Sequence, residues 1–410
     1  MMRTLAILLA SLVVGATARL SCKVTSLGGG RDDGPAINAA FKRCAKNGKV
    51  TLDKYYSVNS LLFTTGLDDI QVELSGTVQY TPNIAKWSPE SYFLEYQNAT
   101  TFWFLSGQNI HLYGGGTIDG NGQIWWDTLN NSQNIGTAGG SSRTFARPIP
   151  LTVGNASNVV VEDIFMIGSP FWNNFVYQSK NVTYNNITIN TVSYSTSPTA
   201  NSDGWDIYRS DHVTVTNSWI NNDDDCVSFK PNSTNILVSN LWCNGSHGIS
   251  VGSLGQYAGE TDIVANVSVF NVSMNNAQNG VRIKVFGGNP SANSTAGGGS
   301  GFVRNITYED YSVNNVDNPI LIDQCYSTPA AVCAQFPSKV SISDVHLINI
   351  TGTSSGHNGN VVASLKCSQG CDDITATGTH LTSPKGPATY VCQNITSVQE
   401  LDFNCTSPST

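Results

Sequence analysis

Three carboxylates stand in a row in the segment NNDDDCVSFK, at Asp223, Asp224 and Asp225. Aspartate is a poor strand former, and like charges this close oppose one another's ionisation. A purely structural role explains the run poorly in a chain with only 12% charged residues. A further carboxylate, Asp203, precedes the run in NSDGWD. Together these groups could supply a proton donor and a base.

Two later segments add a histidine and two cations. His247 lies between a serine and a glycine, and Arg282 and Lys284 alternate with apolar residues in GVRIKVF. Cleavage of a glycosidic bond needs one carboxylic acid to protonate the leaving oxygen and a second carboxylate to activate water or attack carbon. Residues at i and i+2 of a strand point the same way, so the two cations could grip a sugar carboxylate. The imidazole could share the proton of the acid.

A repetitive β architecture must position these segments. Short runs of Val, Ile, Thr and Asn are separated by Gly and Asn turns, and six of the runs resemble one another. They begin at Asn158, Asn181, His212, Asn235, Asn266 and Asn305, in steps of 23, 31, 23, 31 and 39 residues. A propeller blade needs about 40 residues or more, and the leucine framework of leucine-rich repeats is missing. The spacing favours a parallel β-helix, whose successive rungs lie about 4.8 Å apart.

We therefore predict an all-β chain with a single domain, residues 19–410. The segment GGGRDDGPAINAAFKRC predicts a short N-terminal helix that caps the solenoid, and no other segment has a convincing helical pattern. Asparagine at the turns tolerates left-handed backbone and can stack in ladders between rungs. Residues 1–18 combine an early Arg3, an apolar run and a small-residue ATA ending, a pattern typical of a secretory signal peptide.

Cysteine usage and charge indicate the compartment and the partners. The ten cysteines form local couples that we expect to be disulfides: Cys22–Cys44, Cys226–Cys243, Cys325–Cys333, Cys367–Cys371 and Cys392–Cys405. Metal binding is the alternative, but the chain has no CxxC and only six histidines. The formal charge of -8 argues against nucleic acid or an anionic membrane as partner. With several N-x-S/T sequons, these features predict a secreted, extracellular monomer without metal or cofactor.

Taken in order, four motifs resemble the signature of polygalacturonases, the family 28 glycoside hydrolases. The family pattern N-T-D, D-D-C, G-H-G and R-I-K stands here as NSD at 201–203, DDC at 224–226, SHG at 246–248 and RIK at 282–284. The first and third motifs depart from it conservatively. The resemblance extends from 114–126 to the QCY at 324–326, and more weakly to both ends.

The resemblance implies a right-handed parallel β-helix that hydrolyses α-1,4-galacturonosyl bonds of polygalacturonate with inversion. Asp224 would be the general acid, and His247 would support its protonation. Asp203 and Asp225 would hold and activate the water. An inverting pair of carboxyl groups is expected to be about 6.5–9.5 Å apart, which leaves room for that water.

The resemblance also implies how substrate binds. Arg282 and Lys284 would grip the substrate carboxylate, with Tyr326 as a further contact. The segments WDIYRS and HGISVGSLGQY look more like fungal exo-acting members than endo-acting ones, which predicts release of galacturonic acid from the non-reducing end. Exo action requires loops that wall off the cleft. The candidate walls are residues 132–147, the surface loop 287–301, and 325–337.

The adjacency of Asp224 and Asp225 conflicts with a regular strand, which sends neighbouring side chains to opposite faces. We expect the backbone to turn or bulge there, fixed by the link between Cys226 and Cys243. We place Asp223 outside the site and interpret Asp206 as a turn or ladder residue.

Four alternatives stay open. A β-helix pectate lyase would use calcium and an arginine base for β-elimination. A hydrolase of the mixed rhamnose-galacturonate backbone could use the same scaffold, although the complete histidine, arginine and lysine set disfavours it. An endo-polygalacturonase would cut within the chain. A catalytically silent polysaccharide-binding solenoid would tolerate Asp224→Asn without loss.

Overall fold

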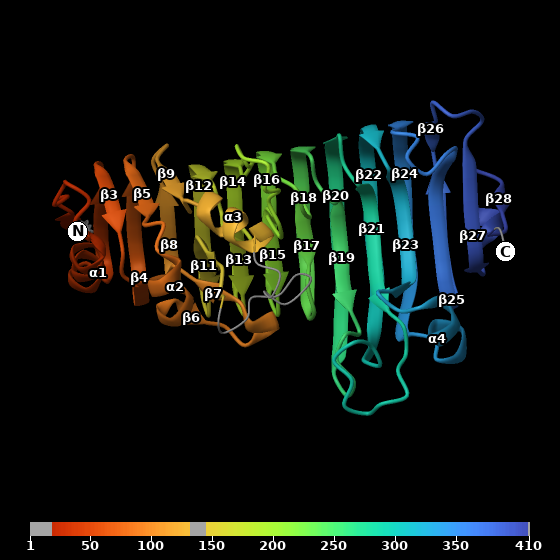
Figure 1. The fold of residues 1–410 in the computed structure, drawn as a ribbon, viewed down its shortest axis with the longest axis horizontal. Helices are drawn as coiled ribbons and strands as arrows, with labels where there is room; N and C mark the ends of the chain where they lie inside the picture. The colour runs from red at the N-terminus through yellow and green to blue at the C-terminus, as the bar shows by residue number, and fades with distance from the viewer. Residues whose placement is uncertain (1–18, 132–144, 409–410) are drawn as a thin grey trace, which may run out of the picture.

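The computed structural model describes residues 19–131 and 145–408. A sheet of 25 strands, paired in parallel, is wound along the long axis of the molecule (Figure 1). The predicted fold class, an all-β, right-handed parallel β-helix, is confirmed. The predicted signal peptide, residues 1–18, lies outside the described residues.

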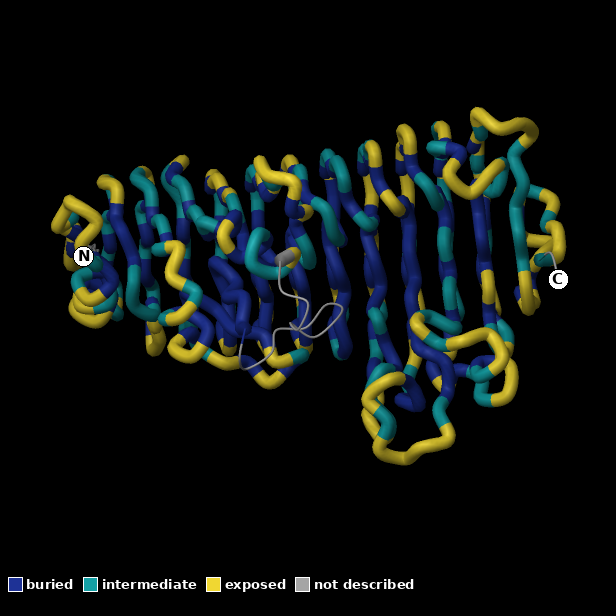
Figure 2. Tube along the Cα trace, in the orientation of Figure 1, coloured by how far each residue is buried: buried dark blue, intermediate teal, exposed yellow. Residues whose placement is uncertain are grey.

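The six similar sequence runs form consecutive rungs. They lie in β12 (Ser157–Ile167), β14 (Lys180–Asn190), β16 (Asp211–Asn221), β18 (Ser233–Asn244), β20 (Thr261–Asn275) and β22 (Ser300–Val316). Branched residues stack in register, with Val182 between Val159 and Val213. Their inward side chains form one apolar column, and Figure 2 shows buried segments in rung after rung along the molecule. A single rung cannot bury this face alone, so the stacking of rungs stabilises the fold.

Asparagines at the turns link the rungs. Asn181 donates a hydrogen bond to Asn158 at 2.8 Å, and Asn266 donates to Asn235 at 2.9 Å. Asn305 continues the second ladder by donating to Asn266 at 2.9 Å. All five residues have a positive φ of 54° to 58°. Asparagine accepts this conformation more readily than most residues, so the predicted ladders are confirmed.

A second row of parallel strands carries the polar segments. It contains β11 (Leu151–Gly154), β13 (Asn174–Tyr177), β15 (Trp205–Tyr208), β17 (Val227–Phe229), β19 (Ile249–Leu254), β21 (Asn279–Phe286) and β23 (Asn318–Tyr326). Each strand pairs with the next in the series. The four polar segments of the sequence therefore lie on neighbouring rungs of one face.

The other strands complete the two ends of the solenoid. The first rungs contain β1 (Leu20–Lys23), β2 (Lys46–Leu52), β3 (Tyr55–Val58), β4 (Leu62–Leu74), β5 (Thr77–Tyr80), β8 (Trp103–Tyr113) and β9 (Thr117–Asp119). The last contain β24 (Lys339–Ser354), β25 (Val361–Thr377), β26 (His380–Thr382), β27 (Thr389–Ile395) and β28 (Cys405–Thr406). A small separate sheet is formed by β6 (Tyr92–Phe93), β7 (Thr100–Thr101) and β10 (Pro148–Ile149).

Helix α1 (Gly34–Arg43) packs on the N-terminal end, as predicted. It buries Phe41 edge-on against Trp103, with ring centroids 5.7 Å apart. The expectation of a single helix is wrong, because the described residues also contain three short helices: α2 (Ile84–Glu90), α3 (Gln123–Asn131) and α4 (Ala330–Gln335). They lie in excursions from the rungs, where burial of residues such as Trp87 and Cys333 stabilises helices too short to show a clear pattern.

All ten cysteines lie in the described residues and form the five predicted disulfides. The metal-binding alternative for these cysteines is therefore excluded. Among the described helices, none combines the length and the apolar character that crossing a bilayer requires.

Candidate active site

Three predicted site residues occupy equivalent places on successive rungs. Asp203 stands two residues before the start of β15, Asp225 two before β17, and His247 two before β19. The strands that follow them are in register, because Trp205 pairs with Val227 and Val227 with Ile249. The rung spacing thus brings side chains some twenty residues apart in sequence into one stack.

The carboxylates of Asp203, Asp224 and Asp225 converge, with an oxygen of each within 4.8 Å of the others. This is closer than the 6.5–9.5 Å expected for an inverting pair, so that expectation is wrong for these oxygens. The physical reason is that Asp203 and Asp225 project from adjacent rungs, whose separation is only about 4.8 Å. The side chain of Asp224 is 17% exposed, whereas those of Asp203 and Asp225 are 4% and 0% exposed.

A bend before β17 lets Asp224 and Asp225 share one site. Residues 222–226 are not in a strand. Buried Asn222 holds the bend, because its side-chain amide donates to the carbonyl oxygens of Ser202, Asp224 and Asp225 at 2.9–3.1 Å. The disulfide between Cys226 and Cys243 fixes the chain directly after Asp225. The predicted departure from regular strand geometry is therefore present.

Asp225 is held by cations and a hydroxyl. Lys284 Nζ lies 2.7 Å from Asp225 Oδ2, and Arg282 Nη1 lies 3.6 Å from Asp225 Oδ1. The Ser250 hydroxyl donates to Oδ1 at 2.6 Å. Burial raises the pKa of Asp225, but the charges of Lys284 and Arg282 outweigh it and leave the pKa below its ordinary value. Asp225 is therefore ionised at neutral pH.

Asp224 is paired with His247. Nδ1 of the imidazole lies 3.1 Å from Asp224 Oδ1, and the amide of Asn201 lies 3.5 Å from Oδ2. Burial opposes ionisation of Asp224, but the hydrogen bond and charge of His247 hold its pKa well below the usual range. Burial lowers the pKa of His247, yet the hydrogen bond that its imidazole donates to Asp224 raises it above the ordinary value. Below the raised pKa of His247, the pair therefore holds one proton, and that proton lies on the imidazole.

Lys230 and Asp206 also belong to this region, although sequence reasoning missed them. Lys230 Nζ lies 3.2 Å from Asp206 Oδ1, 3.8 Å from Asp203 Oδ2 and 5.3 Å from the ring centroid of Trp172. Burial, reinforced by Asp206 and Asp224, raises the pKa of Asp203 well above its ordinary value. Burial also raises the pKa of Asp206 to about 7, although Lys230 opposes the shift. The interpretation of Asp206 as a turn or ladder residue is therefore incomplete.

Asp223 points elsewhere. Its carboxylate accepts a hydrogen bond from Thr199, and its backbone N–H donates to Ser202 Oγ at 2.9 Å. Burial raises its pKa to about 6. It does not line the cavity described next, in agreement with its predicted place outside the site.

A cavity of about 600 Å³ opens above the carboxylates. Six of the seven predicted site residues line it, namely Asp203, Asp224, His247, Arg282, Lys284 and Tyr326, while Asp225 lies beneath its floor. Lys230, Trp172, Gln97, Gln256 and Tyr257 also line it and were not predicted. The Tyr326 ring lies 5.5 Å from the Arg282 guanidinium and 5.7 Å from Lys284 Nζ, so both cations face the same space.

Two predicted walls lie beside this cavity, and one further wall was missed. Residues 325–337 contribute Tyr326 and Ser327. The loop 287–301 supports the part of the wall that carries Gln256, because Gly297 N–H donates to the Gln256 carbonyl at 2.7 Å. Of the third candidate, residues 132–144 lie outside the described part of the chain. The missed wall is the turn at Gln97, whose side-chain amide donates to Gln256 Oε1 at 3.2 Å, and both residues line the cavity.

The turn that carries Gln97 is held by aromatic packing. Gln97 and Asn98 both have left-handed backbone, with φ of 50° and 54°. The preceding Tyr96 stacks on Tyr208, with ring centroids 4.0 Å apart, inside a buried aromatic cluster. We call the contact between Gln97 and Gln256 the latch.

The three carboxylates could also bind a cation, since each offers an oxygen to one point. Lys284 already occupies one side of Asp225, and Lys230 lies beside Asp203. These ammonium groups compete with a metal for the same negative charge.

A parallel β-helix whose cleft combines converging carboxylates with paired cations has the parts of an enzyme that cleaves glycosidic bonds in acidic polysaccharides. The chain belongs to the glycosyl hydrolases family 28, whose sequence model matches residues 45–403. It is 45% identical over 394 residues to the exopolygalacturonase of Cochliobolus carbonum, covering 94% of this chain and 86% of that protein. It is 44% identical to exopolygalacturonase X of Aspergillus niger, covering 95% and 89%.

Among solved structures, the endo-xylogalacturonan hydrolase of Aspergillus tubingensis superposes with a TM-score of 0.85 at 30% identity, covering 95% of this chain and all of that one. The fold and the site thus agree with membership of this hydrolase family.

Proposed function

We propose that this protein hydrolyses α-1,4-galacturonosyl bonds of polygalacturonate from the chain end and releases galacturonic acid. The observation that supports this best is the placement of Arg282 and Lys284 beside the carboxylate cluster, where a sugar carboxylate would meet both cations. Tyr326 lies under them as a further contact. The names of the relatives agree with this activity.

In this proposal Asp224 is the general acid. It is the most exposed of the three clustered carboxylates and can reach a glycosidic oxygen in the cavity. The proton comes from the pair that Asp224 forms with His247. Transfer from imidazolium to carboxylate gives a neutral acid next to the leaving oxygen, so the low pKa of Asp224 in the free protein does not prevent its role.

Water is activated on the other side of the scissile bond. Asp225 is the proposed base, because Lys284 and Arg282 keep it ionised. Asp203, whose pKa is raised, holds the water by hydrogen bonding and is itself oriented by Lys230. Inversion remains part of the proposal, supported by the family resemblance rather than by the carboxyl separation.

We base the proposed exo action on two features, the latch and a second cavity next to it. A neighbouring cavity shares Gln97 and Tyr257 with the catalytic one, and its charged lining residues are three acids, Glu95, Glu260 and Asp262, against one cation, Arg209. A galacturonate chain is an anion, so this acidic space disfavours its passage beyond the latch. The chain end would therefore stop at the wall.

Opening the latch should allow internal cleavage. Internal cuts lower the viscosity of a polymer more per bond than cuts at its end do. We therefore expect the double variant Gln97→Ala, Gln256→Ala to lose viscosity roughly 2- to 10-fold faster per bond cleaved. The effect is modest because the latch is one neutral hydrogen bond. The control is Gln278→Ala, which alters the same cavity away from the latch. Unchanged viscosity loss per bond would remove the latch from the explanation of exo action.

The activity itself is tested with oligogalacturonides in the presence of a chelator. We expect galacturonic acid from the first minutes, no unsaturated product, and the β anomer formed first by NMR. Mixed oligomers at early times would mean endo action, and an unsaturated product with chelator sensitivity would mean a lyase. An α anomer formed first would contradict inversion.

A second candidate, endo hydrolysis of xylose-substituted galacturonan, is favoured by one observation, the similarity to the Aspergillus tubingensis enzyme. Measuring hydrolysis of xylogalacturonan in parallel with that of polygalacturonate distinguishes the two candidate functions.

We further propose that the protein is secreted and acts as a monomer without membrane association. Five disulfides support an oxidising compartment.

A further inference from the structure

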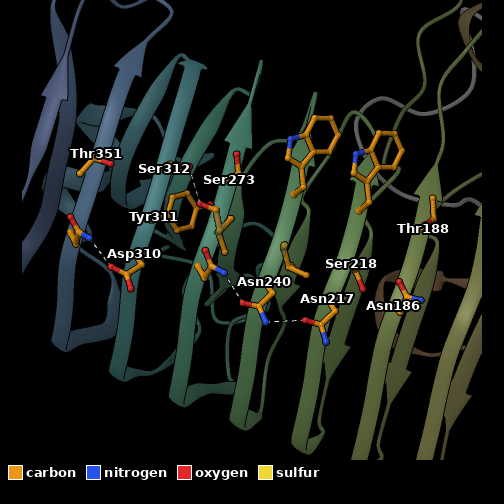
Figure 3. A pocket seen from close by; sticks show the side chains of 16 residues that line it. Asn186, Thr188, Asn217, Ser218, Asn240, Ser273, Asp310, Tyr311, Ser312 and Thr351 are labelled. Carbon is orange, nitrogen blue, oxygen red and sulfur yellow. Dashed lines mark hydrogen bonds between the residues drawn. The ribbon is translucent and has the colours of Figure 1, made fainter.

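A second hollow lies on a different face of the β-helix. Its volume is about 560 Å³, and it shares no lining residue with the catalytic cavity. The lining side chains come from β14, β16, β18, β20, β22 and β24 (Figure 3). Five rung spacings of about 4.8 Å make it roughly 24 Å long. We call this hollow the trough.

Two stacked tryptophans stand in the trough. Trp219 on β16 pairs in register with Trp242 on β18, and their rings are nearly parallel, with centroids 4.8 Å apart and an angle of 4°. Trp219 is 37% exposed, whereas six of the eight tryptophans, all of which lie in the described residues, are buried. The pair forms a rigid aromatic block on the surface.

The residues beside this block are small. Trp219 has Thr188 as its register partner on the preceding rung, and Trp242 has Ser273 on the next rung. Ser312 and Thr351 continue the row beyond Ser273. Short hydroxyl side chains therefore flank the outer faces of both indoles, so a flat ring can lie against either face.

A row of exposed asparagines along the trough offers amides. Asn240 donates to Asn217 at 2.9 Å, and Asn271 donates to Asn240 at 2.7 Å. A side-chain amide has two N–H groups and a carbonyl oxygen with two lone pairs, so one ladder bond of each kind leaves capacity for a ligand. Indole faces with nearby amides and hydroxyls match a pyranose ring, which has apolar faces and a polar rim.

The charge of the trough differs from that of the catalytic cavity. Among the described residues that line it, none is lysine or arginine, and Asp310 alone is charged. The catalytic cavity instead contains Lys230, Arg282 and Lys284. A galacturonate chain would find no cation in the trough, whereas an uncharged glycan meets no electrostatic penalty.

We propose that the trough is a non-catalytic binding site for an uncharged polysaccharide chain, whose sugar rings lie against the outer faces of Trp219 and Trp242. Such a site would hold the enzyme on neutral polysaccharide while the separate cavity acts on its own substrate. This inference does not depend on the proposed activity.

The test is native affinity electrophoresis of the full chain in gels that contain a soluble neutral polysaccharide: β-1,4-galactan, xyloglucan or hydroxyethylcellulose. We expect at least one of them to retard the protein. Trp219→Ala with Trp242→Ala should weaken retardation at least about tenfold, a difference of about 1.4 kcal/mol. Turnover of trigalacturonide should stay unchanged in this variant.

Two further variants keep the result interpretable. Ser273→Phe places a ring against the outer face of Trp242 and should also abolish retardation, with both tryptophans intact; because it also removes the sequon at Asn271, it is compared with the original protein after removal of N-glycans. Phe270→Ala removes another exposed aromatic, 38% exposed and outside the trough, and should have no effect. No retardation by any of the three polymers, or equal retardation of the tryptophan variant, would overturn the proposal.

Glycans on the protein itself provide the last comparison. Asn186, Asn271 and Asn349 line the trough and begin N-x-S/T sequons. The electrophoresis is therefore repeated after enzymatic removal of N-glycans. Retardation before and after removal supports an external polysaccharide, whereas retardation only after removal would mean that the protein's own glycan fills the trough and would refute the proposal.

Discussion

Replacing Asp224 by asparagine is expected to lower kcat on oligogalacturonides by about 10²- to 10⁴-fold, the usual contribution of a general acid. The amide keeps the shape of the side chain but cannot deliver a proton to the leaving oxygen. Arg282 and Lys284 are untouched, so substrate binding should be retained. Single-turnover kinetics measures the chemical step, and titration calorimetry with the inactive variant measures binding.

Asp223→Asn is the matched control, because it makes the same change one residue away. Asp223 contacts Thr199 and lies outside the catalytic cavity, so kcat should change little. Equal turnover in Asp224→Asn and the original protein would remove the acid assignment and favour a silent binding solenoid. Equal losses in both aspartate variants would indicate a general effect of charge or folding instead.

His247 offers a separate check on the same proton. Its raised pKa means that the proton shared with Asp224 is present at low pH and is lost only as the pH rises above the ordinary histidine range. Turnover should therefore decline on the alkaline side. In His247→Asn this decline should move to lower pH, since the imidazole no longer supplies the proton.

The sequence was sufficient to predict the scaffold and most of the site. The six similar runs form in-register rungs because only this alignment places their apolar side chains together in one core. The stack of Val159, Val182 and Val213 illustrates this alignment. Rung stacking then turns sequence steps of twenty to thirty residues into neighbours, which brought Asp203, Asp225 and His247 together.

What the sequence could not show depends on contacts outside the repeat. Gln97 meets Gln256 although 159 residues separate them, and no periodic pattern links an excursion near the N-terminal end to a turn in the middle. Lys230 follows a buried strand and has no motif of its own. The available signal was its position: Lys230 comes one residue after the buried strand β17, on the rung next to Asp206. A cation at the end of a buried strand needs a carboxylate partner.

The second large effect is expected from Lys284→Met, because Lys284 has two roles. Its side chain is 8% exposed and its ammonium lies 2.7 Å from the buried Asp225. Removing it leaves an uncompensated buried carboxylate, which typically costs about 3–5 kcal/mol of unfolding free energy. Chemical denaturation at neutral pH measures this loss, and Lys284→Arg, which keeps the charge, should lose much less.

The same variant should change the pH dependence in a defined direction. Lys284 is the main reason why the pKa of Asp225 lies below its ordinary value, so its removal raises that pKa. A carboxyl group whose pKa is depressed in the folded protein stabilises the fold above the pKa of the unfolded state, and this stabilisation is lost as the pH falls. Lys284→Met should therefore lack this contribution at neutral pH.

The proposed base, Asp225, also becomes protonated at higher pH in this variant. The acidic limb of the kcat profile must therefore shift to higher pH. KM for oligogalacturonides should rise as well, since one of the two cations for the substrate carboxylate is gone. An acidic limb that stays in place while KM rises would assign Lys284 to substrate binding alone and would make Asp203 the better candidate for the base.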